Sequence, residues 1–178
     1  LEKENVFTNT DFKLDAGYQN VEESRHNRNF GNYNLQNRTE KVAVYSLTAN
    51  FETKLKKGNF YYGIENYYDD LKSTADKTNI KTGVVVPLDT RYPNGTNNMM
   101  RNDVYVSYSS KRNEATNFSM GARAGYAALN SSIADNSIVA LPFTEIKQQN
   151  FTYSGNIGLV HNTSENFIVK TNLSSGYR

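Results

Sequence analysis

Apolar and polar side chains alternate along much of this chain. In residues 12–18 (FKLDAGY), every second side chain is apolar or aromatic, and those between are polar or Gly. A β-strand places successive side chains on opposite faces, whereas a helix with a period of about 3.6 residues would scatter the two rows. The alternation therefore predicts β-strands. Six more segments repeat it: residues 43–51, 60–65, 104–109, 118–126, 151–159 and 167–174.

The connections between these segments alternate in length. In outer-membrane β-barrels, short turns lie on one side of the membrane and longer loops on the other. Here the long polar segments are residues 25–37, 74–102 and 130–149, and the tight turns, with Gly or Asn, are residues 54–59, 111–116 and 161–166. We expect an antiparallel meander whose loops share one end of the sheet and whose turns share the other.

The predicted fold is all-β, an antiparallel meander of about seven strands over a single segment, residues 1–178. Bacterial barrels close with an even number of strands, at least eight, so a seven-stranded set stays open. The sequence thus predicts part of a larger transmembrane β-barrel. Each edge would present a row of unpaired backbone groups, and the isolated chain is expected to self-associate.

A soluble β-sandwich binding module is an alternative, because its strands also have one core face and one water face. A sandwich does not require long and short connections to sort to opposite ends. It also gives no reason for the many small residues and Gly in the water-side rows, which suit a lumen lined by other chain segments. A passive porin segment is a further alternative, since it would share the same strands.

Composition and charge exclude several other classes. Hydrophobic residues make up 37% of the chain and the mean hydropathy is −0.71. No run approaches the ~18 apolar residues of a membrane-spanning helix. The 20 basic and 18 acidic residues are scattered, so nucleic acid is not an expected partner. The absence of Cys excludes disulfides and Cys-based metal sites.

Five stretches resemble the barrel of TonB-dependent outer-membrane receptors of the type common in the Bacteroidetes. They are GYQNVEESRHNRNF (17–30), RTEKVAVYSLTANF (38–51), YGIENYYDDLKSTA (62–75), RYPNGT (91–96) and NLSSGYR (172–178). The resemblance implies a 22-stranded barrel in the outer membrane, in contact with its lipid. It also implies a plug domain, the energising partner TonB, and energy-dependent import of a scarce ligand such as a siderophore, haem, cobalamin or glycan. We expect residues 1–178 to be a partial barrel segment, without the plug domain and the remaining strands.

The sequence offers binding candidates and no catalytic constellation. No nucleophile with a base and no metal motif is apparent, so we expect no enzyme activity, no cofactor and no metal. In the loop motif at residues 91–95, Arg91, Tyr92 and Asn94 are candidate contacts for a transported ligand, although packing on neighbouring loops is an alternative role. Three charged residues fall in the water-side rows and are candidate lumen-facing groups: Glu65, Arg123 and Lys170.

Overall fold

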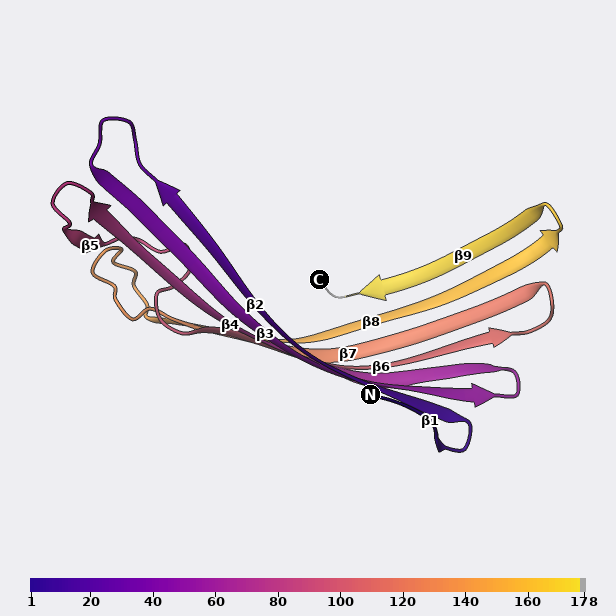
Figure 1. Cartoon of the computed structure of the whole chain (residues 1–178). Helices are drawn as coiled ribbons and strands as arrows, with labels where there is room; N and C mark the ends of the chain where they lie inside the picture. Colours follow the sequence, from indigo (N-terminus) through magenta and orange to yellow (C-terminus); the bar gives the residue numbers. More distant parts are fainter. Residues whose placement is uncertain (177–178) are drawn as a thin grey trace.

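Residues 1–176, the part of the chain that the computed structural model describes, form one antiparallel β-sheet with nine strands (Figure 1). Eight strands follow one another across the sheet, and β5 pairs with the end of β4. These residues contain no helix with the length and apolar character needed to cross a bilayer. The strands are β1 (Glu2–Phe7), β2 (Thr10–Asn27), β3 (Asn34–Leu55), β4 (Gly58–Asn79), β5 (Val85–Pro87), β6 (Asn97–Lys111), β7 (Thr116–Ser132), β8 (Glu145–Ser164) and β9 (Phe167–Gly176).

The predicted antiparallel meander is confirmed, and it contains two strands that the alternation did not reveal. The seven predicted segments lie in β2, β3, β4, β6, β7, β8 and β9. Strand β1 escapes the pattern because Asn5 has a φ of 51° and the register shifts between Lys3 and Phe7. Strand β5 has only three residues, too few to display a period.

The strands are longer than predicted. β3 and β4 have 22 residues each and pair from Asn34↔Asn79 to Leu55↔Gly58. The predicted loop at 25–37 therefore shrinks to residues 28–33, because β2 continues to Asn27. The strand extensions are mostly polar, apart from the aligned Val21, Val42 and Leu71, so the alternation stops while the ladder of backbone hydrogen bonds continues.

Long and short connections lie at opposite ends of the sheet, as the sequence predicts (Figure 1). We call these the loop end and the turn end. The loop end carries residues 28–33, 80–96 and 133–144, and the turn end carries residues 8–9, 56–57, 112–115 and 165–166.

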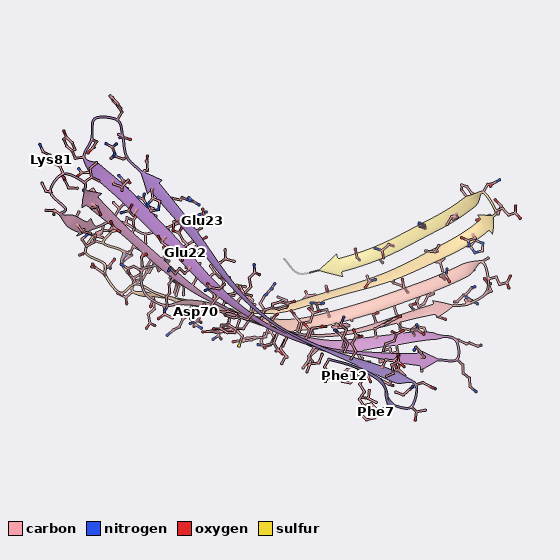
Figure 2. The ribbon with its side chains drawn as sticks, in the orientation of Figure 1. Phe7, Phe12, Glu22, Glu23, Asp70 and Lys81 are labelled. Atoms are coloured by element: carbon pink, nitrogen blue, oxygen red, sulfur yellow. The ribbon has the colours of Figure 1, made fainter. Side chains whose placement is uncertain are left out.

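This sheet has no hydrophobic core. Among the described residues, Ala128 is the one buried hydrophobic residue. Side chains project from both sides of a single layer (Figure 2). Large apolar side chains stay open to the surroundings, with Met120, Tyr153 and Leu173 exposed by 48%, 66% and 72%. A β-sandwich would bury such a face against a second sheet, which residues 1–176 do not contain.

The register gathers apolar side chains on one face, the apolar face, and polar ones on the other, the polar face. Aromatic residues form two bands across the apolar face, with ring centroids 4.8 to 6.3 Å apart within each band. One band, near the turn end, is Phe12, Phe51 and Tyr62, and the other, nearer the loop end, is Tyr18, Tyr45 and Tyr68. Aromatic girdles of this kind flank the lipid-facing zone of outer-membrane barrels.

Two amides interrupt the apolar face between the aromatic bands. Asn66 on β4 lies directly opposite Asn102 on β6 and donates a hydrogen bond to its side-chain oxygen at 2.5 Å. Beyond the loop-end band the same face becomes polar at Asp70, Lys72 and Thr74. The strands thus extend past the apolar zone into a region where both faces are polar.

A glycine in β4 allows a contact between strands that are not neighbours. Gly63 lies between Asn50 on β3 and Tyr105 on β6 in the register. The Tyr105 ring crosses over Gly63, and its hydroxyl donates to the Asn50 side-chain oxygen at 2.5 Å. A Cβ atom at Gly63 would clash with the Ala49 carbonyl oxygen and lie 2.9 Å from the Tyr105 ring.

We therefore expect Gly63→Ala to destabilise the sheet, because the added methyl group displaces Tyr105 and strains β4. The free energy of unfolding should fall by about 1–3 kcal/mol, as for other overpacked sites. Thermal unfolding in detergent micelles, followed by circular dichroism, measures the change. Gly155→Ala is the matched control, because its Cβ would meet nothing closer than 3.5 Å. Equal stability of the two variants would contradict this account.

Candidate functional site

The polar face carries a charged cluster over β4, β6 and β7. Arg123 on β7 reaches across β6 and donates two hydrogen bonds to the Glu65 carboxylate on β4, at 2.7 and 3.2 Å. Its guanidinium also lies 3.7 Å from the Asp103 carboxylate on β6. Gly125 faces Asp103 across the ladder, and a Cβ there would clash with the Asp103 carboxylate. The glycine thus leaves room for this carboxylate.

The cluster continues to β3 through an aromatic ring. The Arg123 guanidinium lies 5.6 Å from the centroid of the Tyr105 ring, and Tyr105 hydrogen-bonds Asn50. Contacts therefore connect four strands, from Asn50 to Arg123. The Arg123 side chain is 41% exposed, and ion pairs this open to solvent contribute little to stability. The cluster therefore offers an ordered and accessible set of donors and acceptors on the polar face.

Lys170 lies apart from this cluster. It belongs to β9, opposite Val160 on β8, whereas Arg123 lies opposite Ser154. The Lys170 position is therefore nearer the turn end. The three charged residues predicted for the water-side rows all lie on the polar face, and the structure brings only Glu65 and Arg123 together.

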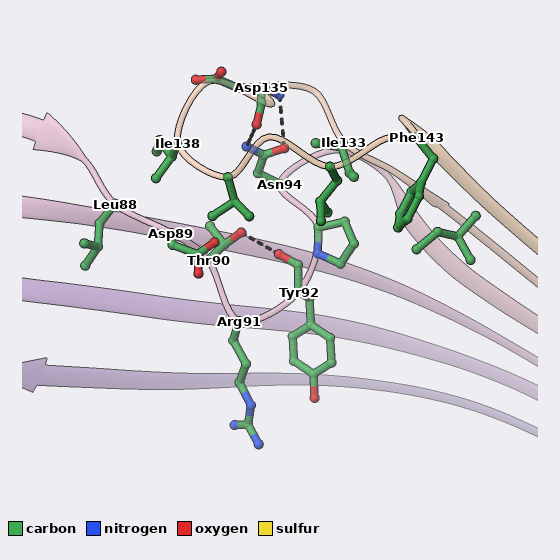
Figure 3. Close-up of a pocket in the computed structure, with 14 residues that line it drawn as sticks. Leu88, Asp89, Thr90, Arg91, Tyr92, Asn94, Ile133, Asp135, Ile138 and Phe143 are labelled. Atoms are coloured by element: carbon green, nitrogen blue, oxygen red, sulfur yellow. Dashed lines mark hydrogen bonds between the residues drawn. The ribbon is translucent and has the colours of Figure 1, made fainter.

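At the loop end, two connections enclose a pocket of about 310 Å³ (Figure 3). One wall is the β5–β6 connection, which supplies Arg91, Tyr92 and Asn94. The other wall is the β7–β8 connection, which is largely apolar. This second wall supplies Ile133, Asp135, Ile138, Val139, Leu141 and Phe143, and Ile146 from the start of β8 completes the lining.

Asn94 fastens the two connections together. Its amide nitrogen donates to the Asp135 carbonyl oxygen at 2.8 Å, and its side-chain oxygen accepts from the N–H groups of Ala134 and Asp135 (Figure 3). Hydrogen bonds from the side chain and the backbone N–H of Ser137 hold the pKa of Asp135 below its ordinary value. Both the nitrogen and the oxygen of the Asn94 amide therefore form hydrogen bonds within the protein, and they hold the two connections together.

Arg91 and Tyr92 are more accessible than Asn94. Their side chains are 46% and 40% exposed, and the guanidinium lies 5.6 Å from the centroid of the Tyr92 ring. Both side chains extend from the connection across the sheet in the close-up (Figure 3). Arg91 approaches the Glu23 carboxylate on β2 to 3.8 Å. The three predicted loop residues thus line one pocket, and the side chains of Arg91 and Tyr92 extend from its edge over the sheet.

Sequence reasoning missed the apolar wall of this pocket. The available signal was the segment IVALPF at residues 138–143, an apolar run inside an otherwise polar connection. The alternation pattern did not indicate this run, because a period of two residues identifies strands and carries no information about loops. The pocket combines an arginine, a phenol and several aliphatic groups, which suits binding of a partly apolar molecule.

The described residues contain no group of three or more His, Cys, Asp or Glu side chains that could hold a metal ion. The His26 ring hydrogen-bonds Asn37 at 2.8 Å, and the His161 ring hydrogen-bonds Thr116 at 2.9 Å. Each ring therefore pairs with a neighbouring strand.

No family model and no curated protein sequence matches the chain. Its fold is similar to the solved structure of the copper transporter OprC, with a TM-score of 0.73 and 12% sequence identity. The similarity covers 97% of this chain and 28% of that chain, so this chain spans little more than a quarter of OprC. At this identity the likeness concerns the fold: the sheet resembles part of the wall of an outer-membrane β-barrel.

Proposed function

We propose that this chain forms part of the wall of an outer-membrane transporter, with its apolar face against lipid and its polar face toward the barrel interior. The observation that carries this proposal is the exposed apolar face of a single-layer sheet, bounded by two aromatic bands. Water is a poor solvent for such a face, whereas the acyl chains of a bilayer match it. The likeness to part of OprC supports the same architecture.

The finer proposal is an energy-dependent uptake receptor of the TonB-dependent type, with a barrel of 22 strands. A plug domain would contact the polar face, where Glu65, Arg123 and Lys170 offer charged groups. The ligand would be a scarce molecule such as a siderophore, haem, cobalamin or glycan. Support comes from the five resembling sequence stretches and from the pocket at the loop end.

In this proposal the loop end faces the outside and meets the ligand first. Arg91 and Tyr92 supply a cation and an aromatic ring, which are frequent anchors at binding surfaces. Asn94 holds the two connections in place and shapes the pocket without touching the ligand. The protein acts by transport, and the proposal assigns it no catalytic step.

Uptake by cells that produce the complete barrel tests this function. We expect saturable uptake of one member of a panel containing a ferric siderophore, haem, cobalamin and an oligosaccharide, and a protonophore should abolish it. Arg91→Ala and Tyr92→Ala should each raise the ligand concentration at half-maximal uptake by about tenfold, because each removes an anchor for the ligand. Lys81→Ala is the control, since Lys81, in the β4–β5 connection, also lies over a tyrosine ring, 5.4 Å from the Tyr33 centroid, but outside the pocket.

Two results would contradict the proposal. Uptake that neither saturates nor responds to the protonophore would favour the passive porin. A protein recovered in the soluble fraction, with its apolar face covered by a second copy, would favour the soluble binding module.

A further inference from the structure

A second hollow, of about 460 Å³, opens between the β5–β6 connection and the loop-end parts of β2 and β3. We call it the arginine hollow. Arg25 lies opposite Arg38 in the register, and Glu23 lies opposite Glu40. All four residues therefore share the polar face. The hollow adjoins the apolar pocket through three shared residues of the connection, but its own lining is mostly charged. Its lining residues are Arg25, Asn27, Arg38, Glu40, Asp89, Thr90 and Arg91.

Glu40 is the unusual residue in this lining. It is only 5% exposed. One carboxylate oxygen accepts a 3.5 Å hydrogen bond from the Ser73 hydroxyl, which also accepts one from the Tyr92 backbone N–H. The other oxygen, Oε2, is buried and has no hydrogen-bond partner among the described residues. A buried carboxylate oxygen without a donor is costly and rare, so a donor from outside the sheet is called for.

The arginines retain donors beyond their contacts within the protein. Arg25 donates from Nε and Nη2 to one Glu23 carboxylate oxygen, at 2.7 and 2.5 Å, and Arg38 donates from Nη1 to Gln36 at 3.1 Å. Arg91 approaches Glu23 to 3.8 Å. Each guanidinium carries five N–H donors in a planar fork that matches carboxylates and phosphates. Three guanidinium groups and the carboxylates of Glu40 and Asp89 therefore line one hollow, and the Glu23 carboxylate pairs with Arg25 beside it.

We propose that the arginine hollow binds a sugar acid, whose carboxylate lies on the guanidinium groups and whose hydroxyl donates to Glu40 Oε2. This inference rests on the proposed uptake function and narrows its ligand. A simple anion would leave Glu40 without a donor, and a neutral sugar would leave the arginines without an anion. A molecule that carries both a carboxylate and hydroxyl groups satisfies both needs.

Binding of three small probes to the full chain in detergent micelles tests the inference. The probes are glucuronate, with carboxylate and hydroxyls, glucose, with hydroxyls alone, and acetate, with the carboxylate alone. Saturation-transfer NMR titrations would give each dissociation constant. We expect glucuronate to bind at least about tenfold more tightly than either glucose or acetate, because hydrogen bonds to charged groups are among the stronger ones.

Two variants separate the contributions of the two groups. Glu40→Gln keeps the size of the side chain. It should raise the dissociation constant of glucuronate by about tenfold and leave that of acetate unchanged. Arg38→Gln should remove most of the preference for glucuronate over glucose. Arg101→Gln is the matched control, because Arg101 lies on the same face, 4.9 Å from the Tyr67 ring, outside the hollow. It should bind glucuronate as the parent does.

Equal binding of glucuronate and acetate, or equal binding of glucuronate and glucose, would overturn the inference. Retention of the glucuronate preference in both Glu40→Gln and Arg38→Gln would overturn it as well. These outcomes are separate from failure of the proposed function. A protein that inserts into the outer membrane and shows no glucuronate preference refutes only the sugar-acid inference.

Discussion

Backbone hydrogen bonds between antiparallel neighbours hold residues 1–176 in place, since these residues bury almost no apolar side chain. Strands β3 and β4 pair along 22 residues each, and the ladder satisfies their backbone donors and acceptors within the sheet. A bilayer requires this arrangement, because no water is present there to accept unpaired backbone groups. Because the sheet is a single layer, the side chains of each face contact a different environment. A one-residue slip in register would exchange the apolar and polar faces.

The two faces solve different problems. On the apolar face, aromatic bands and aliphatic residues match a lipid environment, and Asn66 and Asn102 satisfy each other where they interrupt it. On the polar face, glycines at 63 and 125 make space for Tyr105 and for the Asp103 carboxylate. Long side chains there connect strands that are not neighbours, as Tyr105 and Arg123 do. Beyond the loop-end aromatic band, most side chains on both faces are polar and the connections form two hollows, so the proposed ligand contacts lie at the loop end.

The sequence revealed what depends on period and missed what depends on contact across strands. Residues 118–126 and 151–159 alternate strictly because one face is apolar, and their strands were predicted correctly. Residues 19–27 continue β2 without alternation because both faces are polar there, so their extended structure was missed. Arg91 and Tyr92 stood out as a loop motif. Glu40 did not, because its contact with Ser73 on β4, and that of Ser73 with the Tyr92 backbone, form only in the folded chain.

The orientation of the faces is the central claim, and site-directed fluorescence tests it most directly. The chain has no Cys, so single cysteines can be labelled without background. Neighbouring residues of one strand lie at nearly the same depth on opposite faces, as Met120 and Ser119 do on β7 and Tyr153 and Ser154 do on β8. In lipid vesicles, labels at Met120→Cys and Tyr153→Cys should be quenched by lipid-borne nitroxides and protected from aqueous iodide, and labels at Ser119→Cys and Ser154→Cys should show the reverse. Equal quenching of both members of a pair, or iodide quenching at Met120→Cys and Tyr153→Cys, would contradict the account.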